Sequence, residues 1–130
     1  MTIEFRVSDL IPAAPDKVYQ AWLNTEQHTG MTGGKAVISD EVGGEFTAWD
    51  GYISGKNLEL NPPLRIFQSW RTTEFETSDP DSLLEITFVA EGPATRVTIR
   101  HSELPDHGMQ YQQGWIDAYF KPMKEYFMQK

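Results

Sequence analysis

The strongest periodic pattern in the chain lies at its C-terminal end. Over residues 110–130, large apolar side chains recur four positions apart, at Trp115, Tyr119, Met123 and Phe127. This spacing places them on one face of an α-helix, so the sequence predicts a long amphipathic helix that packs on another element. Pro122 interrupts the pattern. Its missing N–H predicts either a bend in the helix or the end of one helix and the start of another.

Residues between Lys35 and His101 follow a different pattern, in which apolar and polar positions alternate. Such alternation is typical of half-buried strands. It predicts six strands, near residues 36–39, 45–49, 52–60, 64–71, 84–88 and 97–101. Within the third of these strands the alternation changes parity, which predicts a β-bulge near residues 55–57.

The beginning of the chain supplies the remaining elements. Residues 3–7 alternate like a strand, Pro15 suits the first turn of a short helix, and a second short helix is expected from Thr25 to the glycines at 30–34. Consecutive strands joined by short turns pair antiparallel. We therefore expect a single domain over residues 1–130 with an α+β, helix-grip fold. In this fold, a curved antiparallel sheet of about seven strands wraps around the long C-terminal helix, and two short helices follow the first strand.

The amino-acid composition argues against some classes of binding partner. The chain has 130 residues and a formal charge of −8, which argues against nucleic-acid binding because that rests on Lys and Arg neutralising phosphates. No segment is apolar over the length needed for membrane insertion, and the N-terminus lacks the pattern of a signal peptide. The chain contains no cysteine, which fits a reducing compartment. We therefore expect a cytoplasmic protein.

The three histidines do not indicate a metal or cofactor site. His28, His101 and His107 show no metal-ligand spacing, so we expect no metal and no cofactor. His101 shares a strand face with Val97 and Ile99 and therefore points toward the space between sheet and helix. A hydrogen-bonded wall residue is the favoured interpretation of this histidine, and a catalytic residue is the alternative.

A sheet wrapped around one helix can enclose a hollow, and the inward positions identify its candidate lining. These positions are aromatic, aliphatic or sulfur-bearing, with a few polar groups suited to orienting a ligand. The candidate ligand-binding residues are Trp22, Phe46, Gln68, Trp70, Phe88, Ile99, His101, Trp115, Tyr119 and Met123. Plain core packing explains the same residues equally well, and the choice depends on a volume that the sequence does not give.

Several motifs, taken in order, resemble a known family. They lie at residues 43–46 (GGEF), 50–55 (DGYISG), 58–62 (LELNP) and 66–71, and later at 95–101, 104–105, 114–115 and 119–127. The set is similar to the START-like (SRPBCC) superfamily, and within it to the domain shared with the C-terminal part of the activator of the heat-shock protein 90 ATPase. The resemblance implies a cavity between sheet and helix, which superfamily members use for lipids, polyketides, hormones or other apolar molecules. It also implies a connection with a chaperone.

Two functional hypotheses follow. The first is a module that binds a hydrophobic or aromatic small molecule without chemistry. The second is a protein-interaction module related to chaperone ATPase regulation in the stress response, with a chaperone or another protein as partner. An enzyme that uses the same cavity ranks below both, because only His101 and Tyr119 support it.

Overall fold

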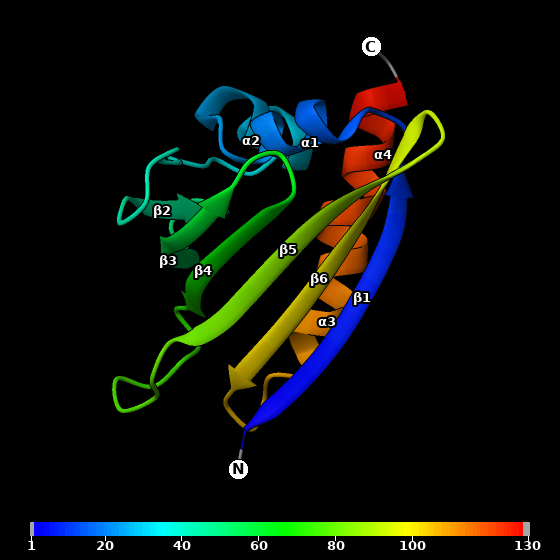
Figure 1. The fold of residues 1–130 in the computed structure, drawn as a ribbon. Helices are drawn as coiled ribbons and strands as arrows, with labels where there is room; N and C mark the ends of the chain where they lie inside the picture. The colour runs from blue at the N-terminus through cyan, green and yellow to red at the C-terminus, as the bar shows by residue number, and fades with distance from the viewer. Residues whose placement is uncertain (1, 129–130) are drawn as a thin grey trace.

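The computed structural model describes residues 2–128, and these form one curved sheet, two short helices and a C-terminal helical segment (Figure 1). The elements in chain order are β1 (Ile3–Ile11), α1 (Pro15–Trp22), α2 (Thr25–Thr32), β2 (Glu45–Ala48), β3 (Ile53–Asn61), β4 (Arg65–Thr72), β5 (Ser82–Glu91), β6 (Ala94–Leu104), α3 (Gln110–Trp115), the π-helical turn η1 (Ile116–Phe120) and α4 (Lys121–Met128). The six strands are antiparallel neighbours in the order β1-β6-β5-β4-β3-β2. This is the α+β, helix-grip arrangement that the sequence predicts.

The sheet has six strands instead of about seven, because residues 36–39 do not form a strand. Only one isolated bridge joins this segment to β2, between Val37 and Thr47. The neighbouring backbone groups bond to threonine side chains of α2. The Oγ1 of Thr29 accepts a hydrogen bond from the Ala36 N–H at 3.0 Å, and the Oγ1 of Thr25 accepts one from the Ile38 N–H at 2.8 Å. Helix α2 therefore takes the hydrogen bonds that a seventh strand would need.

The predicted bulge is present in β3, one residue beyond the expected position. The register of the β3–β4 pair shifts between Asn57 and Glu59. Asn57 is fully buried, and its Nδ2 donates to the carbonyl oxygens of Ser39 at 2.8 Å and Glu41 at 3.1 Å. Its Oδ1 accepts a hydrogen bond from Gln68 Nε2 at 2.9 Å. The bulge therefore bends the sheet and also anchors the loop before β2.

The C-terminal helix is continuous from Gln110 to Met128, and residues 129–130 of the predicted helix lie outside the described part of the chain. The turn η1 ends two positions before Pro122, and the Lys121 N–H that follows it donates to the Ile116 carbonyl. A π-helical turn is wider than an α-helical one, so it accommodates the missing N–H and the ring of a proline without ending the helix. Of the predicted apolar stripe, Trp115, Tyr119 and Met123 are buried, and Phe127 is half-buried.

The core is solid where α1 and α4 meet β1, β5 and β6. Phe88, Ile99 and Met123 have no exposed surface there. Figure 1 shows the C-terminal helix running along β1 and β6, with α1 and α2 beside its α4 end. The other half of the helix, α3 and η1, runs beside β1, and its aromatic side chains reach Trp70 and Thr72 of β4. It is this half that borders the candidate site.

The close contact between β2, β3 and β4 predicts a sharp difference between two glycine substitutions. A Cβ at Gly55 would lie 1.9 Å from the Ser69 carbonyl oxygen and 2.8 Å from the Phe46 ring. Gly55→Ala should therefore lower the free energy of unfolding by about 2–3 kcal/mol. As a control, Gly30→Ala in α2 meets only an ordinary contact of 3.5 Å to Tyr126 and should raise it by about 0.5–1 kcal/mol. Urea denaturation checks both values. Equal effects of the two substitutions would contradict the packing described here.

Candidate functional site

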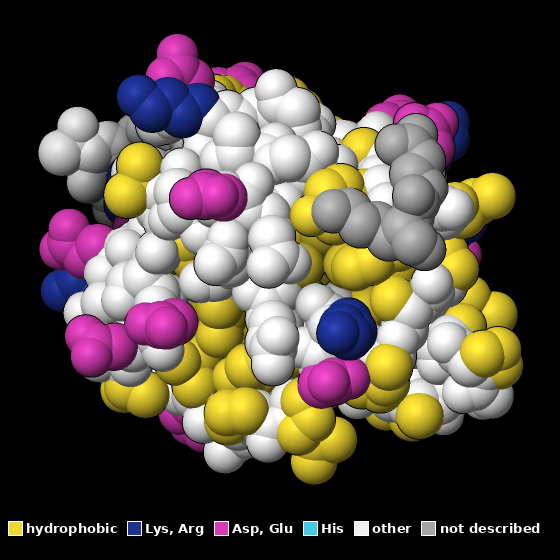
Figure 2. Space-filling view, turned by 90° about the horizontal axis from the view of Figure 1, so that it is seen from above, with side chains coloured by type: hydrophobic (Ala, Val, Ile, Leu, Met, Phe, Trp, Pro, Cys, Tyr) yellow, Lys and Arg dark blue, Asp and Glu magenta, His cyan; other side chains and the backbone are white. Residues whose placement is uncertain are grey.

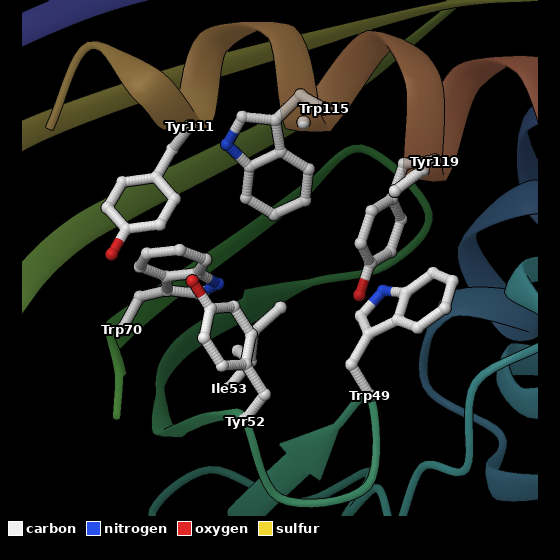
Figure 3. A pocket seen from close by; sticks show the side chains of 9 residues that line it. Trp49, Tyr52, Ile53, Trp70, Tyr111, Trp115 and Tyr119 are labelled. Carbon is white, nitrogen blue, oxygen red and sulfur yellow. The ribbon is translucent and has the colours of Figure 1, made fainter. Parts of the chain in front are cut away.

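A pocket of about 410 Å³ lies between the α3–η1 half of the helix and the sheet (Figure 3). Its walls are almost entirely apolar, and aromatic rings surround its open centre. The lining residues are Trp49, Tyr52, Ile53, Trp70, Tyr111, Gly114, Trp115, Ala118 and Tyr119. We call this the aromatic pocket.

The helix wall of the aromatic pocket combines large and small residues at helical spacing. Tyr111, Trp115 and Tyr119 are four positions apart and all are buried. Gly114 and Ala118, also four apart, lie beside them, and a Cβ at Gly114 would meet no atom within 4 Å. The large residues hold the helix against the sheet, and the small ones leave space next to it.

The opposite wall depends on the turn between β2 and β3. Trp49, Asp50 and Gly51 have φ angles of 52°, 58° and 88°, so three successive residues adopt the left-handed region. That conformation is uncommon for a bulky residue such as tryptophan. It turns the Trp49 side chain toward the helix, as Figure 3 shows. The ring also packs on Gly34, where a Cβ would lie only 2.4 Å from it.

A buried chain of hydrogen bonds joins the helix to the sheet behind the pocket. Trp115 Nε1 donates to His101 Nδ1 at 3.1 Å, so the proton of a neutral His101 is on Nε2. That Nε2–H then donates to Ser82 Oγ at 2.9 Å, and Ser82 donates to the Trp70 carbonyl at 2.7 Å. Burial lowers the pKa of His101 to about 3. His101 is thus neutral and hydrogen-bonded, and it lies behind the lining of the pocket instead of forming part of it.

A second chain of hydrogen bonds fixes Tyr119. His28 Nδ1 donates to the Trp22 carbonyl at 2.8 Å, so its Nε2 accepts from the Tyr119 hydroxyl at 3.0 Å. Burial lowers the pKa of His28, more than the bond to Trp22 raises it, and His28 is held neutral. Burial likewise raises the pKa of Tyr119, against a smaller effect of a hydrogen bond from Trp49. Both groups are therefore uncharged near neutral pH.

The end of the pocket next to α3 carries its polar groups. The hydroxyls of Tyr111 and Thr72 are hydrogen-bonded at 2.6 Å. The Tyr52 hydroxyl donates to the Glu74 carboxylate, which also accepts from Gln110 Nε2 at 3.2 Å. The hydrogen bond from Tyr52, followed by the one from Gln110, lowers the pKa of Glu74. A carboxylate that stays ionised is thus bound to the hydroxyl of a lining residue.

The structure brings some of the ten predicted site residues together at the pocket. Trp70, Trp115 and Tyr119 line it. Trp22 stacks behind them, with ring centroids 5.1 Å from Tyr119 and 6.1 Å from Trp115. His101 supports Trp115 from behind through its hydrogen bond.

The other five predicted residues lie away from the lining. Phe88, Ile99 and Met123 fill the solid half of the core. Gln68 is buried and bonded to the Asn57 side chain, and Phe46 packs beside Gly55. That any of the ten residues binds a ligand stays a prediction.

Six lining residues were not among those predicted. Tyr111, Gly114 and Ala118 continue the helical spacing of the stripe, so a wider helical face would have included them. Ile53 is the first inward residue of β3. Trp49 and Tyr52 flank the Asp50–Gly51 turn, and the alternation of strand residues gives no indication of where such side chains point.

The lining of the aromatic pocket consists of aromatic, aliphatic and glycine residues. None of its nine residues carries a charged side chain. No group of three or more His, Cys, Asp or Glu side chains within residues 2–128 is arranged to hold a metal ion. In the same residues, no helix has the length and apolar character needed to cross a membrane.

A curved antiparallel sheet that holds an amphipathic C-terminal helix, with a pocket between them, defines a domain of the START-like class. Comparison with known proteins gives the family within this class. The chain belongs to the family described as activator of Hsp90 ATPase homolog 1-like protein, whose family model matches residues 12–128.

Two relatives and one solved structure illustrate the similarity. The chain is 28% identical over 116 residues to an activator of 90 kDa heat shock protein ATPase homolog of Dictyostelium discoideum. The matched region covers 88% of this chain and 30% of that protein. It is 23% identical over 126 residues to homolog 2 of Mus musculus, covering 95% and 37%. The chain thus spans about a third of the length of these two relatives. The crystal structure of an HSP90 activator from Plasmodium falciparum has the same fold, with a TM-score of 0.85, 19% identity and coverage of 95% of this chain and 94% of that one.

The buried histidines predict how stability depends on pH. An unfolded chain takes up a proton on His101 near pH 6.5, whereas the folded protein does so only near pH 3. Between these values the unfolded state binds more protons, so the free energy of unfolding should fall as the pH falls below about 6.5. The contribution of His101 is up to about 1.4 kcal/mol per pH unit, and His28 acts in the same direction.

Urea denaturation at a series of pH values, combined with NMR of the histidine rings, measures this effect. The His101 ring signals should stay those of the neutral form with the proton on Nε2 from neutral pH down to about pH 4.5. A His101 ring that titrates near its ordinary value in the folded protein would contradict the buried hydrogen-bond chain.

Proposed function

We propose that this domain binds a small apolar or aromatic molecule in the aromatic pocket. The observation that supports this most is the lining: aromatic rings surround a pocket of about 410 Å³, with very little polar surface. Ligand sites in proteins are typically concave and apolar, with few polar groups.

The hydrogen bonds that hold the lining residues from behind are those expected of a preformed ligand site. Trp115 and Tyr119 are each held by a buried hydrogen bond to a neutral histidine. Rings held in this way lose little conformational entropy when a ligand enters. As part of the same proposal we place the protein in the cytoplasm, in keeping with the absence of cysteine.

A substitution at Gly114 tests the proposal without removing any existing contact. A Cβ there meets no atom within 4 Å, and the position lines the pocket, so the side chain of Gly114→Leu should occupy the ligand's space. The affinity for any ligand found in a panel of indoles, naphthalenes and fatty alcohols should fall about tenfold or more. Gln113→Leu adds an apolar side chain one position away, outside the lining, and should leave the affinity unchanged.

The tryptophans supply the readout. Trp49, Trp70 and Trp115 line the pocket, whereas Trp22 lies behind it. In an amide and indole NMR titration, the indole N–H signals of the three lining tryptophans should move most. If no member of the panel moves them at millimolar concentration, or if Gln113→Leu weakens binding as much as Gly114→Leu, the proposal fails.

Membership of the family favours a second candidate function, the regulation of a chaperone ATPase. Both curated relatives carry that activity in their names, although this chain spans about a third of their length. The surface offers apolar side chains for a protein contact. Leu64, Val89 and Met128 are more than half exposed, and Figure 2 shows apolar side chains gathered on one face with acidic ones among them.

The second candidate predicts that the domain raises the rate of ATP hydrolysis by the Hsp90-type chaperone of its own organism. The Gly114→Leu variant should raise it equally, because the pocket is not needed for a surface contact. The measurement is a steady-state ATPase assay at increasing concentrations of the domain, with isothermal titration calorimetry for binding. No change in rate together with no binding would exclude this function.

A further inference from the structure

The wall of the aromatic pocket is made mostly of aromatic rings, which is a more specific property than being apolar. Six of its nine residues are aromatic: Trp49, Tyr52, Trp70, Tyr111, Trp115 and Tyr119. They come from the helix on one side and from the sheet and its turn on the other, so that rings enclose the centre from several directions (Figure 3). Aromatic rings carry negative charge density on their faces and attract a cation placed within about 6 Å of the ring centroid.

The charges around the pocket favour a cation over an anion. The lining contains no lysine or arginine, so a carboxylate or phosphate inside it would have no partner and would be costly to bury. Arg71, which follows Trp70, and Lys121, two positions after Tyr119, are each paired with a carboxylate, Asp81 at 2.8 Å and Asp117 at 3.3 Å. The chain as a whole carries a formal charge of −8.

One carboxylate is bound directly to the wall. Glu74 accepts hydrogen bonds from the Tyr52 hydroxyl and from Gln110, the first residue of α3. A phenol that donates to a carboxylate becomes more electron-rich, because hydrogen-bonded groups polarise one another. The Tyr52 ring should therefore attract a cation more strongly than an unbonded tyrosine does. His107 is a further titratable group at this end, and its Nε2 lies 3.2 Å from the Tyr111 hydroxyl.

We infer that the aromatic pocket selects an organic cation, of the quaternary ammonium class, over a neutral or anionic molecule of the same shape. This inference rests on the proposed function and names the class of ligand for the same site. A trimethylammonium group is weakly hydrated, and its methyl groups can pack against the apolar wall. Its positive charge is attracted by the faces of the aromatic rings and by the Glu74 carboxylate.

A set of three molecules with the same branched group tests the inference. Choline carries the charge, 3,3-dimethylbutan-1-ol replaces its nitrogen with carbon, and 3,3-dimethylbutanoate carries the opposite charge. Titrations at about pH 8, where an ordinary imidazole is neutral, are followed by the indole N–H signals of the three lining tryptophans. Choline should bind about threefold to thirtyfold more tightly than the neutral alcohol, and the carboxylate should bind most weakly.

A matched pair of charge substitutions separates a local effect of Glu74 from the overall charge. Glu74→Gln should lower the affinity for choline severalfold and leave that for the neutral alcohol unchanged. Glu125→Gln removes the same charge from an exposed position on α4 and should change neither. Because Glu74 is exposed, its substitution is not expected to unfold the protein, and far-ultraviolet circular dichroism checks this.

The outcomes distinguish this inference from the proposed function. If the alcohol binds as tightly as choline, or if choline does not bind while the apolar panel does, selection of a cation is overturned and the apolar site stands. Equal effects of Glu74→Gln and Glu125→Gln on choline would also overturn it. If neither the three molecules nor the panel binds, both proposals fail.

Discussion

The structure depends on one buried contact, the attachment of the C-terminal helix to the sheet through Trp115. Its indole donates to His101 on β6, and its ring lies between those of Trp22 and Trp70, at 6.1 and 5.7 Å between centroids. The hydrogen bond requires a neutral histidine, which burial ensures. Because Trp115 is the last residue of α3, next to η1, this contact fixes the position of the α3–η1 half of the helix. The α4 half packs into a solid core, and the α3–η1 half is held over the sheet at a distance that leaves the aromatic pocket.

The two halves differ because their side chains differ in size and direction. Met123 of the α4 half is fully buried in the core. The α3–η1 half instead has the small residues Gly114 and Ala118 beside its aromatic residues. Such small residues leave volume that no neighbour fills. The left-handed turn at Trp49 closes the opposite side with another ring. A helix-grip domain can therefore have a filled core and an apolar pocket at once. The family connects the fold with a chaperone ATPase, and a pocket on the inside leaves the outer surface available for such a partner.

The sequence predicts the fold well because the fold follows from periodicity. The stripe through Trp115, Tyr119 and Met123, the inward residues of β4 to β6 and the parity change in β3 all describe faces, and faces are what alternation and helical spacing encode. The expected strand at residues 36–39 was wrong because side chains of α2 compete for its backbone groups, a contact between distant segments. The pocket was predicted only in part for a similar reason. Phe88 and Trp70 both point inward, yet one fills volume and the other borders it, and the difference is set by the neighbours that three-dimensional packing brings to each. Trp49 and Tyr52 were not predicted, because they flank a turn and the alternation of strand residues does not give the direction of side chains there.

The central claim is that the space between α3–η1 and the β2–β3 end of the sheet is a preformed ligand site. The most direct measurement is the set of intermolecular nuclear Overhauser effects between a bound aromatic or ammonium ligand and the methyl groups of the protein. The account predicts contacts to the methyls of Ile53 on β3 and Ala118 on η1, which line the pocket from the sheet and from the helix. Contacts instead to Ile99 and Met123, in the filled half of the core, or to exposed methyls such as those of Val89 alone, would contradict it.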